Sequence, residues 1–465
     1  MNKTEPTIQV GILTASEIKF KLNGLFIGPD NKLYDDRKLV ALLKGKILFN
    51  GNFYDEISFT PQSHKCSFDL KNVVIGINFH WERKENQRFK GALKFIIEGS
   101  NVTAINQITV EDYLISVISS EMSATASEEL LKAHAVISRS WLLHPIVNMH
   151  GRAYQPVGTG RDLSKIKIND NVETHGHASL PTNIIEQYPN HITKWYERDA
   201  HTHFDVCADD HCQRYQGITR ASTTAVEEAI AATRGEVLMF DGKICDARFS
   251  KSCGGASETF ENCWAPEHYP YLSKIIDNPI TPEGFEQDLT IEANAEKWIR
   301  ESPEAFCNTT DTKVLAQVLN NYDQETTDFY RWKVEYSQAE IAKLLARRSG
   351  FDFGEILDLI PVKRGESGRI IELKIVGTKQ TVIVGKELEI RKWLSNSHLY
   401  SSAFVVDKSE IINGVPQYFT LTGAGWGHGV GLCQIGAAVM GEKGYTYDEI
   451  LLHYFREAEL KKIYP

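Results

Sequence analysis

Short runs of apolar and β-branched residues alternate with polar turns over roughly the first 100 residues of the chain. The runs are IQVGIL (8–13), KILFNG (46–51), VVIGINFHW (73–81) and ALKFIIEG (92–99). Runs of this length and composition, bounded by Gly- and Asn-containing turns, are typical of β-strands. We therefore expect residues 1–100 to form a β-rich N-terminal region.

The spacing of apolar residues becomes helical after residue 109. Val110, Leu114 and Ile118 recur along one face of a predicted helix over 110–122, and Ser127 is a suitable N-cap for a second helix over 127–144. Later segments predict a helix over 225–235, strands over 236–250 and 331–337, a strand pair over 369–385 and a helix over 447–455. Strands and helices are segregated rather than alternating, which predicts a mixed α+β fold.

The composition changes between residues 145 and 200, where Pro, Gly, Asn, His and Asp are frequent and periodicity is weak. This pattern indicates a loop-rich insertion. We therefore expect a second region over 101–465 that carries an insertion at about 145–200.

The overall composition is that of a globular protein, with 465 residues, 42% of them hydrophobic and 24% charged. The net charge of −10 argues against a nucleic-acid partner, which requires clustered Lys and Arg. We expect no membrane span, because no apolar run reaches about 18 residues. The first residues, MNKTEPT, lack the basic and apolar regions of a signal peptide.

Histidines and cysteines gather in the segment HTHFDVCADDHC (201–212). The candidate metal ligands are His201, His203, Cys207, His211 and Cys212. Two thiolates and several imidazoles match the tetrahedral N/S ligand set that zinc prefers. Since adjacent His211 and Cys212 rarely bind one ion together, we expect three or four of the five to be ligands.

Three other segments contain residue types suited to chemistry on a sugar. Glu121, near the end of the first predicted helix, is a candidate general acid, although a glutamate at a helix end is usually only solvated. Small hydroxyls beside paired glycines in FSKSCGG (249–255) suit close approach of the backbone to a ligand, or an ordinary hairpin turn. In GAGWGHGVG (423–431), Trp426 and His428 lie within a glycine-rich frame that suits a carbohydrate pocket.

Together these segments resemble the SpoIID/LytB family of peptidoglycan-cleaving proteins. Similar segments occur in that family in the same order, and in this chain they are INQITVEDYLISVISSEM (105–122), KAHAVISRSW (132–141), CADDHCQRYQG (207–217), FSKSCGGASE (249–258), SGRIIELKIVG (367–377) and GAGWGHGVGLCQIGA (423–437). The resemblance covers about residues 100–460. Cys433 stands where the family usually has Ser.

The resemblance implies a SpoIID-like catalytic core and a lytic transglycosylase, a lyase that cleaves the MurNAc-β-1,4-GlcNAc bond and leaves 1,6-anhydroMurNAc ends. The substrate would be glycan strands stripped of stem peptides. Glu121 would act as acid and then as base, and Arg139 would orient Glu121 or the sugar. The implied substrate contacts are Ser250, Ser252, Gly254, Gly255, Trp426, His428 and Gln434.

The resemblance also implies a structural zinc, bound by His201, Cys207 and Cys212 with His203 or His211 as the fourth ligand. It places the protein in the cell envelope, with a cell-wall amidase as a further partner.

Two other classes of function fit the same residues. A non-catalytic glycan-binding protein that enhances an amidase would use the Trp426 pocket and the zinc but would tolerate loss of Glu121. A zinc hydrolase would use the Cys/His cluster itself, with Asp209, Asp210 or Glu121 as general base.

Overall fold

The chain was analysed as a computed structural model that describes residues 4–75, 83–123, 126–148, 186–188, 190–196, 201–209, 212–219, 222–318 and 327–465. Helices and mixed sheets share these residues, so the predicted α+β fold is confirmed. Within the described ranges, every helix is too short or too polar to cross a membrane.

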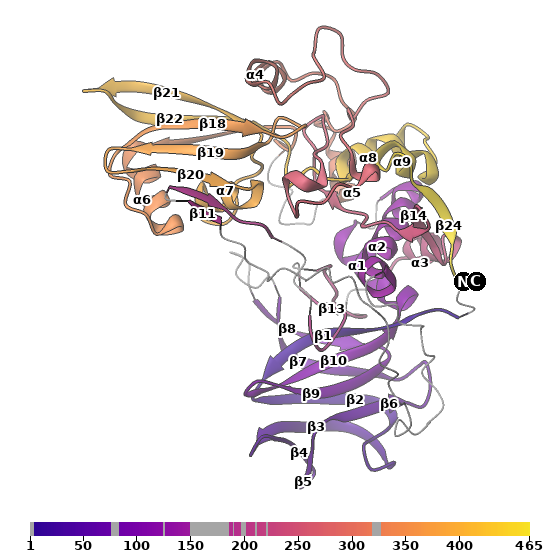
Figure 1. Cartoon of the computed structure of the whole chain (residues 1–465). Coiled ribbons are helices and arrows are strands. Elements are labelled where there is room, and N and C mark those ends of the chain that lie inside the picture. The colour runs from indigo at the N-terminus through magenta and orange to yellow at the C-terminus, as the bar shows by residue number, and fades with distance from the viewer. Residues whose placement is uncertain are drawn as a thin grey trace, which may run out of the picture.

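The N-terminal sheet lies at one end of the molecule (Figure 1). Its strands are β1 (Thr7–Ala15), β2 (Glu17–Ile27), β3 (Leu33–Leu43), β4 (Lys46–Phe49), β5 (Asn52–Tyr54), β6 (Ile57–Pro61), β7 (Ser67–Ile75), β8 (Arg83–Phe89), β9 (Ala92–Glu98), β10 (Asn101–Thr109) and, at one edge, β13 (Val206–Cys207). Alternate residues of these strands are buried, and Phe20 packs against Phe59 and Phe95 with ring centroids 5.3 and 5.0 Å away. The sheet therefore continues beyond residue 100, to Thr109.

A helical layer covers the end of β10 and contains the central helix of the molecule (Figure 1). It consists of α1 (Val110–Glu121), α2 (Glu128–Asn148), α3 (Thr224–Ala232), α5 (Thr312–Val318), α8 (Gln434–Glu442) and α9 (Tyr447–Tyr454), with a small sheet of β14 (Glu236–Phe240), β15 (Lys243–Ile244) and β24 (Glu459–Lys462). Residues 133–143 of α2 are all buried, because neighbouring elements surround this helix on every side. Ser127 caps α2 as predicted, since its Oγ accepts from the Leu130 N–H at 3.4 Å.

A sheet lobe projects from the opposite end of the molecule (Figure 1). One of its sheets has the order β11 (Glu186–Tyr188), β12 (His191–Thr193), β20 (Thr381–Gly385), β19 (Ile370–Gly377), β18 (Ile356–Arg364), and the other has the order β17 (Arg331–Ser337), β22 (Val415–Ala424), β21 (Phe404–Ile412). Helices α6 (Gln338–Ser349) and α7 (Glu387–Trp393) complete the lobe, and α4 (Glu292–Glu301) lies beside β21 and β22. The strand pair predicted over 369–385 is confirmed as β19 and β20.

Only part of the predicted insertion at 145–200 belongs to the described residues. Helix α2 continues through Pro145 to Asn148, and β12 adds to β20 of the sheet lobe. Residues 149–185, 189 and 197–200 lie outside the described ranges.

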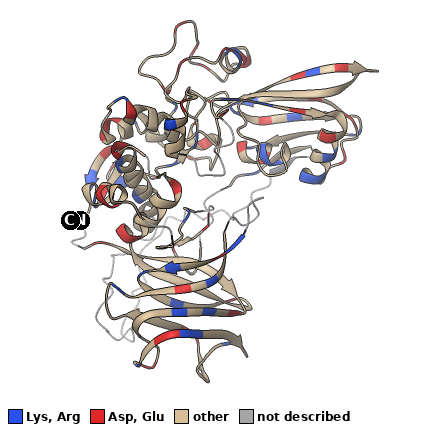
Figure 2. Cartoon of the chain, turned by 180° about the vertical axis from the view of Figure 1, so that it is seen from behind, with Lys and Arg blue, Asp and Glu red and all other residues tan. Residues whose placement is uncertain are grey.

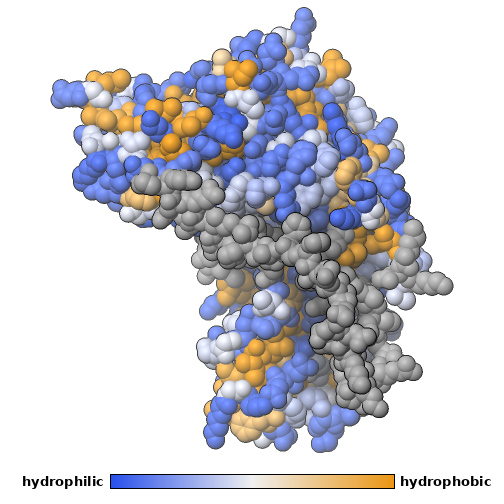
Figure 3. All heavy atoms as spheres, viewed as in Figure 1, coloured by the Kyte–Doolittle hydropathy of each residue, from blue (hydrophilic) through white to orange (hydrophobic). Residues whose placement is uncertain are grey.

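The surface is mixed in charge and mostly polar. Lys and Arg are interspersed with Asp and Glu along the strands and helices (Figure 2). Hydrophobic side chains also reach the surface on the N-terminal sheet and the sheet lobe (Figure 3). Exposed examples are Phe53 on β5 and Ile411 on β21.

Candidate functional site

The structure brings together three of the predicted zinc ligands, His201, Cys207 and Cys212. Their donor atoms all lie within 4.8 Å of one another, and His201 Nε2 is 3.4 Å from Cys212 Sγ. Zinc bonds of about 2.0 to 2.3 Å in a tetrahedron place neighbouring ligand atoms about 3.3 to 3.8 Å apart. This donor set therefore fits zinc.

The other two predicted ligands have different outcomes. His203 is exposed and does not belong to the group. His211 lies outside the described residues.

The cluster is fixed at the edge of the N-terminal sheet. Strand β13 runs parallel to β1, with Cys207 opposite Gly11. A Cβ at Gly11 would lie 2.6 Å from the Phe204 ring, so glycine makes room for that ring, which in turn stacks on His201 at 4.5 Å. The Gln9 N–H donates to Asp205 Oδ2 at 2.8 Å.

Glu121 lies at the end of α1, next to the segment that follows the cluster. It is half-buried, and its Oε1 accepts from the Arg214 N–H at 3.2 Å. Arg214 is two residues beyond Cys212. The cluster and the candidate acid are therefore linked by a short stretch of backbone.

The segment that follows Arg214 is itself held against α1. Tyr215 stacks on Tyr113 with ring centroids 4.9 Å apart, and its hydroxyl donates to Asn106 Oδ1 at 2.6 Å. The Gln216 N–H donates to Ser116 Oγ at 3.1 Å. These contacts fix the backbone that binds the Glu121 carboxylate.

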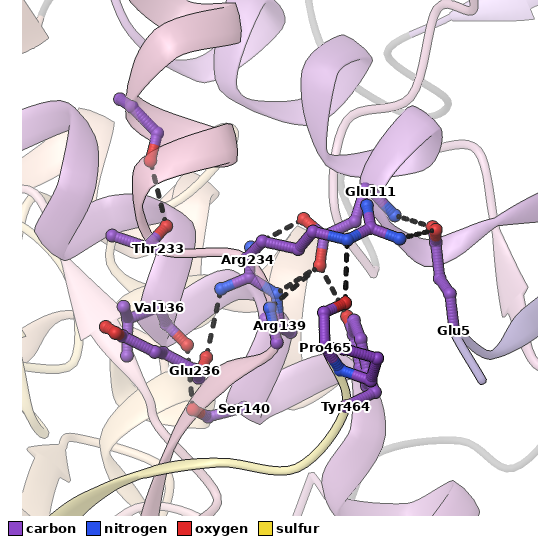
Figure 4. Close-up of polar contacts among 12 residues, drawn as sticks. Glu5, Glu111, Val136, Arg139, Ser140, Thr233, Arg234, Glu236, Tyr464 and Pro465 are labelled. Atoms are coloured by element: carbon purple, nitrogen blue, oxygen red, sulfur yellow. Dashed lines mark hydrogen bonds and ion pairs between the residues drawn. The ribbon is translucent and has the colours of Figure 1, made fainter. Parts of the chain in front are cut away.

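Arg139 has a different role from the one that the sequence predicted. Its side chain is fully buried, and its Nε and Nη2 donate to Glu111 at 3.0 and 2.6 Å while Nη1 donates to the Glu236 carbonyl at 2.9 Å (Figure 4). Glu111 also accepts from the Gly235 N–H and the Tyr464 hydroxyl. Because these interior groups bind its guanidinium, Arg139 is not positioned to orient Glu121 or a sugar.

The two glycine-containing segments predicted to contact substrate lie against each other. Ser250 pairs with Cys433 between β16 (Phe249–Ser250) and β23 (Leu432–Cys433), and Ser252 and Trp426 exchange backbone hydrogen bonds of 3.0 and 2.8 Å. Gly254 has φ 76°, and a Cβ there would lie 2.7 Å from the Gly425 nitrogen. Glycine is therefore required at this crossing.

The predicted substrate contacts divide into surface and interior residues. Trp426 and His428 are partly exposed. Trp426 packs on Phe329 and Tyr400, with ring centroids 4.6 and 4.4 Å away. His428 Nδ1 accepts from the Val430 N–H at 3.0 Å. Partial burial and the nearby Arg248 lower the pKa of His428 well below its usual value, which favours the neutral imidazole.

The remaining predicted contacts lie in the interior. Ser252, Gly254 and Gly255 are buried, with Gly255 packed under Trp298 and Tyr330. Gln434 is 3% exposed, and its Nε2 lies 3.1 Å from His134 Nε2. Ser250 is buried too, and its Oγ has no hydrogen-bond partner among the described residues. These buried residues support the partly exposed residues of the glycine-rich segment.

Helix α2 connects the Glu121 side of this region to the glycine-rich side. His134 Nδ1 lies 3.2 Å from Ser138 Oγ, and the Gln213 side chain donates to the Ser138 carbonyl at 3.3 Å. The end of α5 adds a second connection, since the Ser123 N–H donates to the Gln317 carbonyl and Lys251 Nζ to the Val318 carbonyl. Both predicted functional segments therefore rest on the same helices.

The sequence did not predict three features of the interior. Arg369, which directly precedes β19, donates to the Gly427 and Cys253 carbonyls. It therefore supports the glycine-rich segment. His134 and a buried set of three cysteines and one aspartate were also missed. Their partners are far apart in sequence, and no local pattern marks them.

Two family models match separate parts of the chain. A family model described as stage II sporulation protein (SpoIID) matches residues 98–240, which hold Glu121 and the Cys/His cluster. A model described as a domain of unknown function (DUF8618) matches residues 258–431.

The chain is also similar to several bacterial proteins. It is 22% identical to stage II sporulation protein D of Bacillus subtilis over 77% of this chain and 76% of that protein. An uncharacterized protein of Brachyspira hyodysenteriae is 24% identical over 80% of this chain and 72% of its own length. An amidase enhancer of Bacillus subtilis is 24% identical over 52% of this chain and 33% of its own length.

Proposed function

The chain belongs to the SpoIID family, and on that premise we propose that it is a lytic transglycosylase of peptidoglycan with Glu121 as its catalytic acid and base. Its substrate is the glycan strand stripped of stem peptides, cleaved at the MurNAc-β-1,4-GlcNAc bond. The similarity to sporulation and amidase-enhancer proteins supports a role at the cell wall.

The observation that carries this proposal is the setting of Glu121. Glu121 is half-buried at the end of α1, and its carboxylate accepts a hydrogen bond from the Arg214 backbone N–H. A catalytic acid must be held in one orientation and still be reachable, and this side chain meets both conditions. Trp426 and His428, partly exposed on the glycine-rich segment, provide an aromatic surface and an imidazole for a sugar.

The proposed reaction needs only one carboxyl group. Glu121 donates its proton to the glycosidic oxygen as the bond from that oxygen to C1 of MurNAc breaks, and the bonding electrons leave with the oxygen. The Glu121 carboxylate then accepts the proton of the C6 hydroxyl of the same MurNAc while O6 bonds to C1. Glu121 ends protonated, and no water is consumed, whereas glycoside hydrolases use two carboxylates.

The Cys/His cluster has a supporting role in this proposal. Zinc held by His201, Cys207 and Cys212 would crosslink the segment that leads to Arg214. Arg214 then holds Glu121 through its backbone N–H. A chelator is expected to reduce activity in parallel with unfolding, whereas a zinc hydrolase would lose activity while still folded.

The test is product analysis with amidase-treated peptidoglycan. The unmodified protein is expected to release fragments with anhydroMurNAc ends, seen by mass spectrometry, and Glu121→Gln to release none. Gln keeps the acceptor for the Arg214 N–H, so the variant should remain folded. Glu228→Gln, on the exposed face of α3, is the matched control and should cleave normally.

Other products would contradict the proposal. Reducing ends would identify a hydrolase that uses water. Equal cleavage by Glu121→Gln would exclude Glu121 as the acid.

A non-catalytic role has one specific observation in its favour, the similarity to an amidase enhancer over 52% of this chain. In that case neither the unmodified protein nor Glu121→Gln would cleave glycan. Both proteins would bind glycan and would increase the rate of an added cell-wall amidase.

A further inference from the structure

Four side chains from distant parts of the chain meet in the interior below the glycine-rich segment: Cys253, Asp277, Cys307 and Cys433. Their donor atoms all lie within 4.8 Å of one another, and all four residues are buried. Cys253 Sγ and Cys307 Sγ are 3.6 Å apart. Within the described residues, this group shares no member with the His201 cluster.

Each member is placed by a different part of the fold. Cys253 follows β16, and Cys433 ends β23 and precedes the first residue of α8. Asp277 follows the 3₁₀ turn Pro270–Leu272, and Cys307 follows α4. The group therefore joins the glycine-containing turn to the helical layer.

Hydrogen bonds from backbone groups of the set itself and from one surrounding residue orient the donor atoms. The Cys253 N–H donates to Cys433 Sγ at 3.2 Å, and the Cys307 N–H donates to Asp277 Oδ2 at 2.9 Å. The Tyr454 hydroxyl donates to Asp277 Oδ1 at 2.7 Å. Outer hydrogen bonds of this kind hold the ligands of protein metal sites in place.

We infer that Cys253, Asp277, Cys307 and Cys433 bind a second zinc ion, separate from the predicted site at His201, Cys207 and Cys212. Three sulfur donors and one carboxylate form a set that zinc accepts, and soft thiolates favour it over magnesium or calcium. Zinc–sulfur bonds of about 2.3 Å in a tetrahedron place two sulfurs about 3.8 Å apart. The observed 3.6 Å between Cys253 and Cys307 agrees with this spacing.

Burial makes this site structural. All four side chains are buried, so an ion bound by them would be shielded from solvent. Four protein ligands fill a tetrahedral zinc, and no ligand position is left for a substrate. The ion would fix the Cys253 turn against α8 and thereby the backbone that pairs with Trp426.

The test is the metal content of the purified protein after dialysis against metal-free buffer. The unmodified protein is expected to hold about two zinc ions per chain, one at each site. Cys207→Ser with Cys212→Ser should remove one ion, and Cys433→Ser should remove the other. Asp277→Asn, which keeps one of the two acceptor oxygens that Tyr454 and Cys307 use, should also weaken the second site. Cys245→Ser, at a buried thiol outside both groups, is the matched control and should change nothing.

A spectroscopic measurement keeps the inference testable if Cys433→Ser fails to fold. Cobalt added to the Cys207→Ser, Cys212→Ser protein should give the charge-transfer bands of tetrahedral cobalt–thiolate bonds. Three results would overturn the inference: absence of those bands in folded protein, a Cys433→Ser variant with unchanged zinc content, or a Cys253–Cys307 disulfide in non-reducing peptide mapping.

Discussion

At the scale of single residues, Arg139 illustrates how a buried charge can be structural rather than catalytic. Its ion pair with Glu111 is nearly free of solvent, with exposures of 0% and 8%. Breaking a buried pair by removing one partner costs about 3 to 5 kcal/mol, because the other charge is left uncompensated. We therefore expect Arg139→Met to lower the free energy of unfolding by about that amount in urea denaturation.

The matched control for Arg139 is Arg300→Met. Arg300 pairs with Asp407 at the surface, where the exposures are 37% and 50%, and such pairs contribute about 1 kcal/mol or less. If both substitutions cost the same, the buried network of Figure 4 would not be the source of the stability.

Trp426 is the residue from which we expect direct contact with glycan. Loss of its stacking surface should weaken binding about tenfold, which corresponds to about 1.4 kcal/mol. The measurement is co-sedimentation of Trp426→Ala with denuded glycan, in the Glu121→Gln background so that the glycan remains intact. Phe53→Ala removes an exposed ring on β5 of the N-terminal sheet and should bind normally. Unchanged binding by Trp426→Ala would exclude this surface.

At the scale of elements, the contact between α2 and α8 should respond to pH. Burial, and secondarily Lys251, lower the pKa of His134 to about 3 from the usual 6.5. The unfolded chain therefore binds a proton as pH falls below about 6.5, while the folded protein does not, so stability decreases. Between pH 7 and pH 4 this residue should remove about 3 kcal/mol.

The check on this pH effect is the slope of stability against pH rather than stability itself. His134→Gln retains a polar side chain facing Gln434, and its unfolding free energy should fall less steeply than that of the unmodified protein over this range. Parallel curves for the two proteins would contradict the role of His134.

Elements differ in how far the sequence predicts them. Helix α1, helix α9 and the β19–β20 pair were predicted because their patterns depend on residues close together in the chain. The contacts that define the sites depend on distant residues. Cys253 and Cys433 are 180 positions apart, and Arg139 and Glu111 are 28 apart. Residues 133–143 of α2 are all buried, so the sequence of this stretch could not indicate which neighbour Arg139 faces.

At the scale of the whole molecule, the two ends of the chain belong to one unit. The same hydrophobic core contains Ile8 of β1, Leu114 of α1 and Tyr464 near the C-terminus. Arg234 adds a link, since it donates to Glu5 and to the Pro465 carbonyl. The N-terminal sheet and the helical layer should therefore unfold together.

The sheet lobe has a core of its own, which includes Ile341, Leu373 and Phe419. Because its buried side chains form a cluster separate from the larger core, we expect two unfolding transitions, seen as two groups of amide protons in hydrogen exchange. Leu373→Ala should lower the stability of the lobe alone by about 2 to 5 kcal/mol, and Leu93→Ala on β9 should do the same to the larger unit alone. If the two cores were coupled, each substitution would change the hydrogen exchange of both groups of amide protons. Separate shifts would instead mean that the lobe can open while the part carrying Glu121 and the Cys/His cluster stays folded.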